Sequence, residues 1–418
     1  MPAQPPADFP RFARAGLLEA LADTPVVLLH GPRQCGKTTL ARWVCEPAGF
    51  GYLSFDDDTL RAAALADPAG FVADLPPRMV LDEVQRVPQI FTALKATVDR
   101  DRTPGRFLLT GSANVLLLPR LADSLAGRME ARRLHPLAQC ELAGRDSAFL
   151  ATLFGASFAF RAQARLGSEL AERIVAGGYP AALARQGARR RDWYRAYLET
   201  LVQRDVRDMA RIGALAALPR LLEGAAGQTA RLVNISRMAG PFQLSRPTIR
   251  DYVTLLERVF LIEQLPPWHN NRLKRLVKTP KLHLCDTGLA AALLRVDAAA
   301  LWRDRALLGQ LLETFVLQEL RRMASWHGEP VTFHHFRDKD GVEVDLVLER
   351  GAFELAGLEV KAAASVDEAD FRGLRKLKAA AGQRFVCGVV LYDGEHTLRF
   401  GDGLFAVPLR ALWGMAGA

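Results

Sequence analysis

Apolar runs separated by small or polar residues recur along the first third of the chain. Four of them occupy residues 25–30, 52–55, 79–81 and 107–110. Unbroken apolar runs of this kind are typical of strands buried on both faces of a parallel sheet. The stretch after the first run, residues 38–44, has the composition of a helix. This alternation predicts an α/β domain built on a parallel sheet.

The spacing of apolar positions becomes helical in the middle of the chain. Residues 234–239 suit a short helix, and the pair Gly240-Pro241 would end it. A second helix is expected after the cap residue Ser245, with Pro247 tolerated in its first turn. Its apolar positions follow the i, i+3, i+4, i+7 rule and form one buried stripe, made of Ile249, Tyr252, Val253 and Leu256.

The apolar residues 259–262 predict a strand directly after this second helix. Helix, turn, helix and strand together form the plan of a winged helix-turn-helix. Arg246 and Arg250 lie off the apolar stripe, so they would face a DNA groove in such a module. The alternative is a lid or a dimer contact that never meets DNA, because a fold does not fix a function.

The last third of the chain combines one apolar-striped helix with alternating strands. Glu313 lies at the border of the stripe that Leu308, Leu311, Leu312, Phe315 and Val316 form. Strands are expected at residues 331–337 and 342–348, with a tight turn between them, and a third at 358–361. Because side chains alternate along a strand, Asp345 falls on the polar face of the second strand, and Glu359 and Lys361 share a face of the third.

A phosphate-binding loop follows the first apolar run. It reads Gly-Pro-Arg-Gln-Cys-Gly-Lys-Thr from Gly31 to Thr38. Its glycines let backbone N–H groups approach phosphate oxygens, while Lys37 reaches the β- and γ-phosphates and the Thr38 hydroxyl holds Mg²⁺. The helix N-terminus behind the loop adds the positive end of its dipole. The alternative is a glycine turn that matches this motif by chance. If the motif is a phosphate-binding loop, the predicted nucleotide-binding residues are Gly31, Pro32, Arg33, Gln34, Cys35, Gly36, Lys37, Thr38 and Thr39.

The third apolar run ends in two acids, Asp82 and Glu83. Ligands bind beyond the carboxyl ends of strands in open α/β sheets, which places both acids near the predicted loop if their strand is its neighbour. Asp82 would hold Mg²⁺ and Glu83 would polarise the attacking water. The alternative is a buried strand that ends in two solvated acids.

Two further residues are candidates for the same site. Ser112 follows the fourth run and could sense the γ-phosphate or orient water, although a plain Gly-Ser turn would look the same. Arg128 follows a small-residue turn and could neutralise transition-state charge within its own subunit or across the interface of a homo-oligomer. A solvated surface arginine is the equal alternative.

These motifs resemble a large prokaryotic family of AAA-type ATPases. The resemblance rests on the loop from Gly31 to Thr38, on Leu-Asp-Glu-Val-Gln at 81–85, on Leu-Thr-Gly-Ser at 109–112 and on Ser-Leu-Ala-Gly-Arg at 124–128. It extends over essentially the whole chain, because the second half resembles the C-terminal domain of unknown function in that family. The resemblance implies an ATPase core with a glutamate after the metal-binding aspartate, and little about biology.

The C-terminal residues also resemble the restriction-endonuclease-like phosphodiesterase fold. Its signature is an aspartate followed by Glu-x-Lys, often with a helical glutamate upstream, and here these are Glu313, Asp345, Glu359 and Lys361. Such hard oxygen ligands suit Mg²⁺ or Mn²⁺, which would activate water while Lys361 offsets charge. The alternatives are a retained fold without cleavage chemistry and a coincidental pattern on an exposed strand face.

Charge and composition favour a polyanionic partner. The chain has 418 residues, a net charge of +9 and a sequence pI of about 9.6, which suits nucleic acid. Basic residues gather at 188–195 and 272–278; either segment could lie along phosphates or form a solvated face. Five scattered cysteines without a Cys-x-x-Cys pair, no signal-peptide pattern and no long apolar run predict a cytoplasmic protein without a membrane partner.

Together these features predict an α/β protein of four parts. They are a P-loop NTPase domain with a parallel sheet at 1–165, a helical connector at 166–215, a winged-helix-like domain at 216–280 and a restriction-endonuclease-like α/β domain at 281–418. The predicted function is ATP hydrolysis by a DNA-associated protein whose nucleotide state controls the nuclease-like domain. The rival is a non-nucleolytic, ATP-gated switch for protein interaction or regulation.

Overall fold

The computed structural model describes residues 9–112, 125, 127–201, 218–234, 245–271 and 279–414. Two compact units make up the chain. The first contains residues 10–137 and, from much later in the sequence, residues 254–261. The second contains residues 138–253 and the part of the chain after residue 261. None of the described helices is long and apolar enough to cross a membrane.

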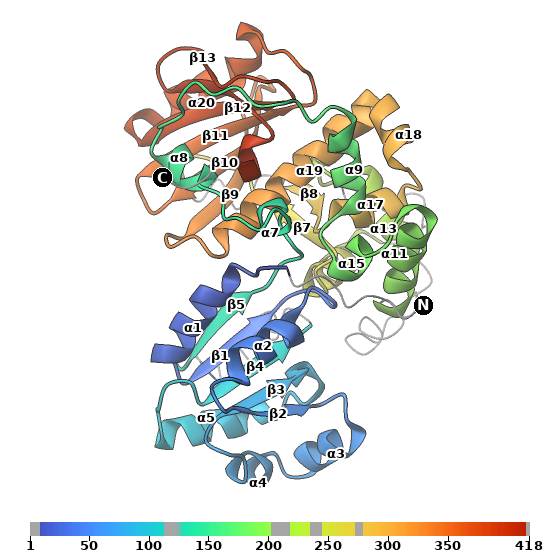
Figure 1. The fold of residues 1–418 in the computed structure, drawn as a ribbon, viewed down its shortest axis with the longest axis vertical. Coiled ribbons are helices and arrows are strands. Elements are labelled where there is room, and N and C mark those ends of the chain that lie inside the picture. Colours follow the sequence, from blue (N-terminus) through green and yellow to red (C-terminus); the bar gives the residue numbers. More distant parts are fainter. Residues whose placement is uncertain are drawn as a thin grey trace. The chain divides into compact units, whose positions relative to one another are not determined.

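The first unit is built on a five-stranded parallel sheet, drawn in blue and cyan in Figure 1. Its strands lie in the order β2-β3-β4-β1-β5, with bounds β1 Val26–His30, β2 Gly51–Ser54, β3 Met79–Asp82, β4 Phe107–Gly111 and β5 Met129–Arg133. The helices are α1 Ala13–Asp23, α2 Lys37–Cys45, α3 Asp58–Ala66, α4 Pro68–Ala73 and α5 Ile90–Arg100, with a 3-10 turn at Val84–Arg86. The four apolar runs therefore form four of the five strands as expected.

Strand β1 shows why this sheet is buried on both faces. Its residues point alternately to opposite faces, so Val27 and Leu29 pack with α1 and α2, whereas Val26 and Leu28 join the core that includes Ile90 of α5. All five residues of β1 are buried. The continuous apolar run is the sequence consequence of this two-sided packing.

Helices α7 to α13 begin the second unit. Their bounds are α7 Gln139–Leu142, α8 Phe149–Phe154, α9 Ser168–Ala176, α10 Pro180–Leu183, α11 Gly187–Leu201 and α13 Leu218–Gly227. A three-stranded antiparallel sheet in the order β6-β8-β7 follows, with β6 Arg231–Leu232, β7 Ile262–Leu265 and β8 Lys281–Leu284. Helix α15 (Arg246–Arg258) lies between β6 and β7 in sequence.

Helix α15 confirms the predicted second helix of the middle region. The Ser245 hydroxyl accepts the Thr248 N–H at 3.2 Å, and the four residues of the apolar stripe are buried. Arg246 and Arg250 are exposed, as expected. The predicted short helix at 234–239 and the basic segment 272–278 lie outside the described residues, apart from Asn234.

The prediction of a strand at residues 259–262 was wrong in its bounds. Strand β7 begins only at Ile262, because the preceding residues close the end of α15. The N–H of Leu261 bonds to the carbonyl of Leu256 at 3.0 Å, and the N–H of Phe260 bonds to that of Glu257 at 3.1 Å. This is the Schellman pattern, in which one residue takes the left-handed conformation. Phe260 does so, with φ +58°, where glycine is usual.

The C-terminal half carries a six-stranded mixed sheet, orange and red in Figure 1. Its strands run β13-β14-β12-β11-β10-β9, with bounds β9 Val331–Arg337, β10 Glu343–Arg350, β11 Glu354–Lys361, β12 Phe385–Tyr392, β13 Leu398–Arg399 and β14 Leu404–Pro408. The helices are α17 Thr287–Leu293, α18 Ala298–Arg303, α19 Arg305–Ala324, α20 Arg372–Ala381 and α21 Ala411–Gly414. The predicted helix around Glu313 is α19, and the three predicted strands are β9, β10 and β11.

Candidate nucleotide-binding site

The loop from Gly31 to Thr38 connects β1 to α2, in the strand-loop-helix order that phosphate binding requires. Gly31 and Gly36 have φ +154° and +102°. A Cβ atom on Gly31 would collide with the carbonyl oxygen of Leu134, so only glycine fits there. Gly36 adopts the left-handed conformation directly before α2, which leaves the first N–H groups of that helix facing the loop.

Lys37 is folded into this loop. Its ammonium group donates to the carbonyl oxygens of Gly31 at 3.0 Å and Pro32 at 2.8 Å, and the residue is only 5 % exposed. Arg11 steadies the loop from outside, donating to the carbonyl of Cys35 at 2.6 Å and to that of His135 at 2.7 Å. No sequence motif had pointed to Arg11, because it precedes the loop by twenty residues.

Asp82 ends β3, but β3 is not the neighbour of β1. Strand β4 lies between them, which corrects the expectation of adjacent strands. Asp82 still meets Thr38, whose hydroxyl oxygen is 3.3 Å from both carboxylate oxygens. The hydroxyl of Thr110, on the intervening strand, also donates to Asp82. The extra strand therefore contributes a side chain that spans the gap.

Tyr52 of β2 donates its hydroxyl to Asp82 at 2.6 Å. Burial and this hydrogen bond raise the pKa of Tyr52 above its ordinary value, so the hydroxyl keeps its proton and stays a donor. Asp82 is 5 % exposed, and the hydroxyl groups of three residues contact its carboxylate. Apart from their positions in predicted strands, no sequence pattern marks Tyr52 or Thr110 as site residues.

Glu83 occupies an uncommon backbone conformation, with φ +60° and ψ +43°. Its N–H donates to the Thr110 hydroxyl at 3.2 Å, which fixes this turn. Its carboxylate accepts a hydrogen bond from the Ser112 hydroxyl at 3.0 Å and another from the Gln85 amide. The Gln85 amide also donates to Ser112 at 2.9 Å. The structure thus brings Ser112 beside Glu83 and adds Gln85, which sequence reasoning had missed.

Arg128 is engaged elsewhere in the unit. Its guanidinium pairs with the carboxylate of Asp99 on α5, and this contact lowers the pKa of Asp99. Ser124 and Ala126, from the small-residue turn before Arg128, lie outside the described residues. A role of Arg128 at the phosphates stays a prediction.

His30 closes β1 directly before the loop. Burial, with the nearby charges of Arg133 and Lys37, lowers the pKa of His30 to about 3, so its ring is neutral. The ring of Phe260 packs against it with 5.7 Å between centroids, and the Arg133 guanidinium lies over that Phe260 ring at 4.8 Å. Residues 254–261 thereby complete the flank of the phosphate-loop strand.

The predicted C-terminal residues also come together, around a residue that the sequence analysis had missed. Lys281 of β8 is 4 % exposed in its side chain, and its Nζ lies 2.7 Å from Glu313 Oε1 and 3.5 Å from Asp345 Oδ1. Asp345 Oδ2 accepts the N–H of Val360 at 2.9 Å, and Asp345 also shares a hydrogen bond with Glu359. We call Glu313, Asp345, Glu359 and Lys281 the β8–α19 charge cluster.

Burial dominates the ionisation of this cluster. It raises the pKa of Glu313 to about 8, with Asp345 adding repulsion, and raises the pKa of Glu359 well above its ordinary value. The Nζ of Lys361 lies 3.2 Å from Asp370, and its charge also acts on Glu359. Among the residues that the structure describes, no group of three or more His, Cys, Asp or Glu side chains is arranged to hold a metal ion. The predicted C-terminal Mg²⁺ or Mn²⁺ site is therefore without structural support.

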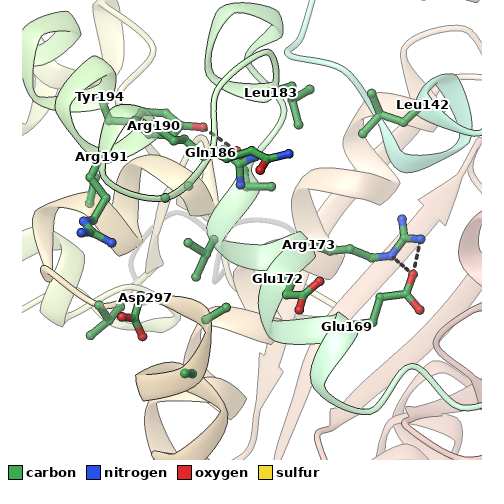
Figure 2. A pocket seen from close by; sticks show the side chains of 18 of the residues that line it. Leu142, Glu169, Glu172, Arg173, Leu183, Gln186, Arg190, Arg191, Tyr194 and Asp297 are labelled. Carbon is green, nitrogen blue, oxygen red and sulfur yellow. Dashed lines mark hydrogen bonds and ion pairs between the residues drawn. The ribbon is translucent and has the colours of Figure 1, made fainter.

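A cavity of about 710 Å³ lies in the second unit. Figure 2 shows its walls, to which α9 and α11 contribute. Its described lining includes three carboxylates and three guanidinium groups, from Glu169, Glu172, Asp297, Arg173, Arg190 and Arg191. Arg173 pairs with Glu169 inside the wall. Because the formal charges cancel, the cavity has no net charge that would select an ionic ligand.

Comparison with known protein families divides the chain into three matched regions. An AAA domain matches residues 23–143, and two domains of unknown function, DUF8612 and DUF4143, match residues 167–300 and 308–412. The AAA match covers the sheet, the phosphate loop and Asp82. The first unit is thus an AAA-type ATPase domain with the P-loop NTPase fold.

Two curated relatives match almost the whole chain. They are uncharacterized proteins of Mycobacterium bovis and Mycobacterium tuberculosis, each 31 % identical over 401 residues, which is 95 % of this chain and 83 % of the relative.

Solved structures are more distant. A Walker-type ATPase of Pyrococcus abyssi is 15 % identical, with 70 % of this chain and 98 % of that chain covered and a TM-score of 0.44. The RuvB Holliday junction branch migration motor of Thermotoga maritima is 18 % identical, with 63 % and 93 % covered and a TM-score of 0.30. Scores this low carry no argument about function. From the curated relatives and the matched domains, we conclude that the chain belongs to the family of AAA-domain proteins that includes the two mycobacterial proteins.

Proposed function

We propose that the chain hydrolyses ATP at the phosphate loop and uses the nucleotide state to control a DNA-associated second unit. The observation that carries the ATPase part is the convergence of Lys37, Thr38 and Asp82 at the carboxyl edge of the parallel sheet. In this proposal the Lys37 ammonium gives up its hydrogen bonds to the loop carbonyls and donates to the β- and γ-phosphates instead. Glu83, next to Asp82, orients the attacking water.

The residues present fit a magnesium ion. The Thr38 hydroxyl and the Asp82 carboxylate are hard oxygen ligands 3.3 Å apart, and the hydroxyl groups of Tyr52 and Thr110 also donate to Asp82. Mg²⁺ would neutralise phosphate charge during the transfer. The protein's own part is to fix the carboxylate: Tyr52 and Thr110 set its orientation from β2 and β4.

Glu83 is held before any water reaches it. Ser112 and Gln85 both donate to Oε2 of its carboxylate, which orients the group so that Oε1 can accept from the water that Glu83 positions. This arrangement supports a role for Ser112 in reporting the γ-phosphate to Glu83. The role of Ser112 rests on its contact with Glu83 alone.

Substitution of Lys37 tests the ATPase assignment. Lys37→Ala should abolish ATP turnover, because the γ-phosphate loses its cationic partner. Phosphate release would be measured beside Lys95→Ala, which removes a lysine of α5 from the same unit. Turnover retained in Lys37→Ala would refute the assignment.

DNA association is proposed from helix α15 and its surroundings. Exposed Arg246 and Arg250 share the outer side of this helix, and the order α13-β6-α15-β7-β8 with its antiparallel sheet is typical of winged-helix modules. Binding to duplex DNA should fall steeply with salt. The Arg246→Ala, Arg250→Ala variant should bind more weakly than one with Arg295→Ala and Arg303→Ala, which loses the same charge elsewhere. Equal affinities of the two variants would count against this surface.

The activity of the C-terminal half separates two candidate functions. The Asp345, Glu359 and Lys361 pattern favours metal-dependent DNA cleavage, and the alternative is a non-nucleolytic regulatory switch. The protein would be incubated with DNA, ATP and either Mg²⁺ or Mn²⁺, in parallel with Asp345→Ala. Cleavage that the variant lacks would support the nuclease, whereas no cleavage together with no salt-sensitive DNA binding would support the switch.

A further inference from the structure

The β8–α19 charge cluster has an unusual source of positive charge. A cluster of acidic side chains of this composition has the oxygen ligands that a divalent cation takes. Here the ammonium of Lys281 approaches Glu313 at 2.7 Å, Asp345 at 3.5 Å and Glu343 at 3.9 Å. Three carboxylates from α19 and β10 therefore converge on one nitrogen atom of the protein itself.

The surroundings of Lys281 leave the ammonium little freedom. Its side chain is 4 % exposed, and the side chains of Glu313 and Asp345 are 13 % and 17 % exposed. Strand β8 is held between β6 and β7 by antiparallel hydrogen bonding, which fixes the backbone from which the side chain projects. The ammonium is therefore part of the fold rather than a flexible surface group.

Asp345 makes further contacts within the protein. Asp345 Oδ2 accepts the N–H of Val360 at 2.9 Å, and Asp345 is hydrogen-bonded to Glu359. Lys361, which the signature assigns to the reaction, pairs with Asp370 at 3.2 Å, and its charge also acts on Glu359. A divalent ion at this place would have to displace these contacts and lie next to a buried ammonium, and like charges at such separation repel strongly.

We propose that the Lys281 ammonium occupies the cation position of this carboxylate group, so that the C-terminal sheet takes no divalent metal and serves instead as a fixed anchor for strand β8. The ion pairs join the three-stranded sheet to α19 and β10 within the second unit. This inference does not depend on ATP hydrolysis or on DNA binding. It makes the C-terminal half a scaffold for the middle region rather than a phosphodiesterase.

Metal titration tests the proposal directly. The full chain without nucleotide would be titrated with Mn²⁺ by calorimetry, in parallel with Asp345→Asn. The proposal predicts the same isotherm for the unsubstituted chain and for Asp345→Asn, because any weak Mn²⁺ binding at Asp82 occurs in both proteins. A Mn²⁺ site that is present in the unsubstituted chain and lost in Asp345→Asn would overturn the proposal.

Removal of the ammonium should create the site that it fills. Lys281→Met keeps the length of the side chain without its charge, and should bind Mn²⁺ at least about tenfold more tightly than the unsubstituted chain. Addition of Asp345→Asn to this variant should remove the gain, whereas Lys378→Met, a control that removes an exposed lysine paired with Asp402, should show none. If Lys281→Met folds by circular dichroism but gains no Mn²⁺ binding, the cation position has been misassigned. If it does not fold, the comparison of the unsubstituted chain with Asp345→Asn still decides.

Discussion

The nucleotide site and the β8–α19 charge cluster use the same residue types and differ in what surrounds their carboxylates. Hydroxyl groups of Tyr52, Thr38 and Thr110 surround Asp82, and these orient the carboxylate without cancelling its charge. The ammonium of Lys281 lies among the C-terminal carboxylates and cancels part of theirs. Acidic residues alone therefore do not define a metal site. A cation can bind only where negative charge remains after the carboxylates have been paired with cationic groups of the protein.

The largest effect should come from removing the cation of the second site. Lys281→Met takes the ammonium away from the buried acidic groups, of which Glu313 is mostly protonated at neutral pH because its pKa is about 8. Loss of one partner of a buried ion pair typically costs about 3–5 kcal/mol. We expect the unfolding transition of the second unit to move to lower denaturant concentration by a corresponding amount. Lys378→Met, which breaks an exposed pair with Asp402, is the control and should leave the transition in place. An unchanged midpoint in Lys281→Met would mean that the cluster is held by other contacts.

At the nucleotide site, removing a charge should affect the reaction rather than the fold. Glu83→Gln keeps the shape of the side chain and its hydrogen bond to Ser112, but cannot accept a proton. ATP hydrolysis should slow by about 10² or more while nucleotide binding is spared. Phosphate release and binding of a fluorescent nucleotide would be measured beside Glu46→Gln, on the exposed end of α2. Loss of binding in Glu83→Gln would assign this residue to the nucleotide rather than to the water.

The two regions should also respond to pH in opposite directions. His30 has a folded pKa of about 3, below the ordinary value of 6.5, so its contribution to the stability of the ATPase unit is present above pH 6.5 and is lost as the pH falls toward 3. Glu313 has a folded pKa of about 8, above the ordinary 4.5, so the folded state holds the proton longer. Its contribution is therefore lost as the pH rises from about 4.5 to 8.

Two neutral variants would separate these contributions. Between pH 7 and 5 the loss from His30 should reach about 2 kcal/mol at 1.36 kcal/mol per unit. His30→Gln should flatten the acid side of the stability profile, and Glu313→Gln should flatten the side above pH 5. The unfolding midpoint would be followed against pH for each variant and for the unsubstituted chain. If both substitutions flattened the same side of the pH profile of stability, the predicted opposite pH responses of the two regions would be wrong.

The smallest expected effect concerns the hydroxyl groups around Asp82. Tyr52→Phe removes one donor at 2.6 Å and nothing else from the core. The Mg²⁺ concentration for half-maximal ATP hydrolysis should rise by about tenfold, as is typical when the partner of a metal-binding carboxylate is lost. Tyr392→Phe, which loses a hydroxyl contact to the carbonyl of His396 in the second unit, is the matched control. An unchanged Mg²⁺ requirement would show that Thr110 and Thr38 suffice.

The sequence was informative where the structure is local. Strands β1, β3 and β4, the phosphate loop and α15 follow from contiguous patterns, and all were predicted within one or two residues. The register also brought Asp345 and Glu359 together, because β10 and β11 pair through Leu346 and Leu358 next to them.

Non-local contacts were beyond sequence reasoning. Lys281 lies 32 residues before Glu313 and 64 before Asp345, in a strand with no motif of its own. The left-handed turn at Phe260 was missed because such turns are usually marked by glycine. The insertion of β4 between β1 and β3 was missed because apolar runs give strands but not their order.

The return of residues 254–261 to the ATPase unit has a practical consequence for dissecting this protein. A fragment that stops at Leu137 contains every nucleotide-site residue, yet it lacks Phe260, which covers His30 and lies under Arg133. Expressed alone, such a fragment would carry a bare apolar flank beside the phosphate loop. An expression design for the isolated ATPase unit therefore has to include both sequence segments, residues 10–137 and 254–261, although more than one hundred residues separate them in the chain.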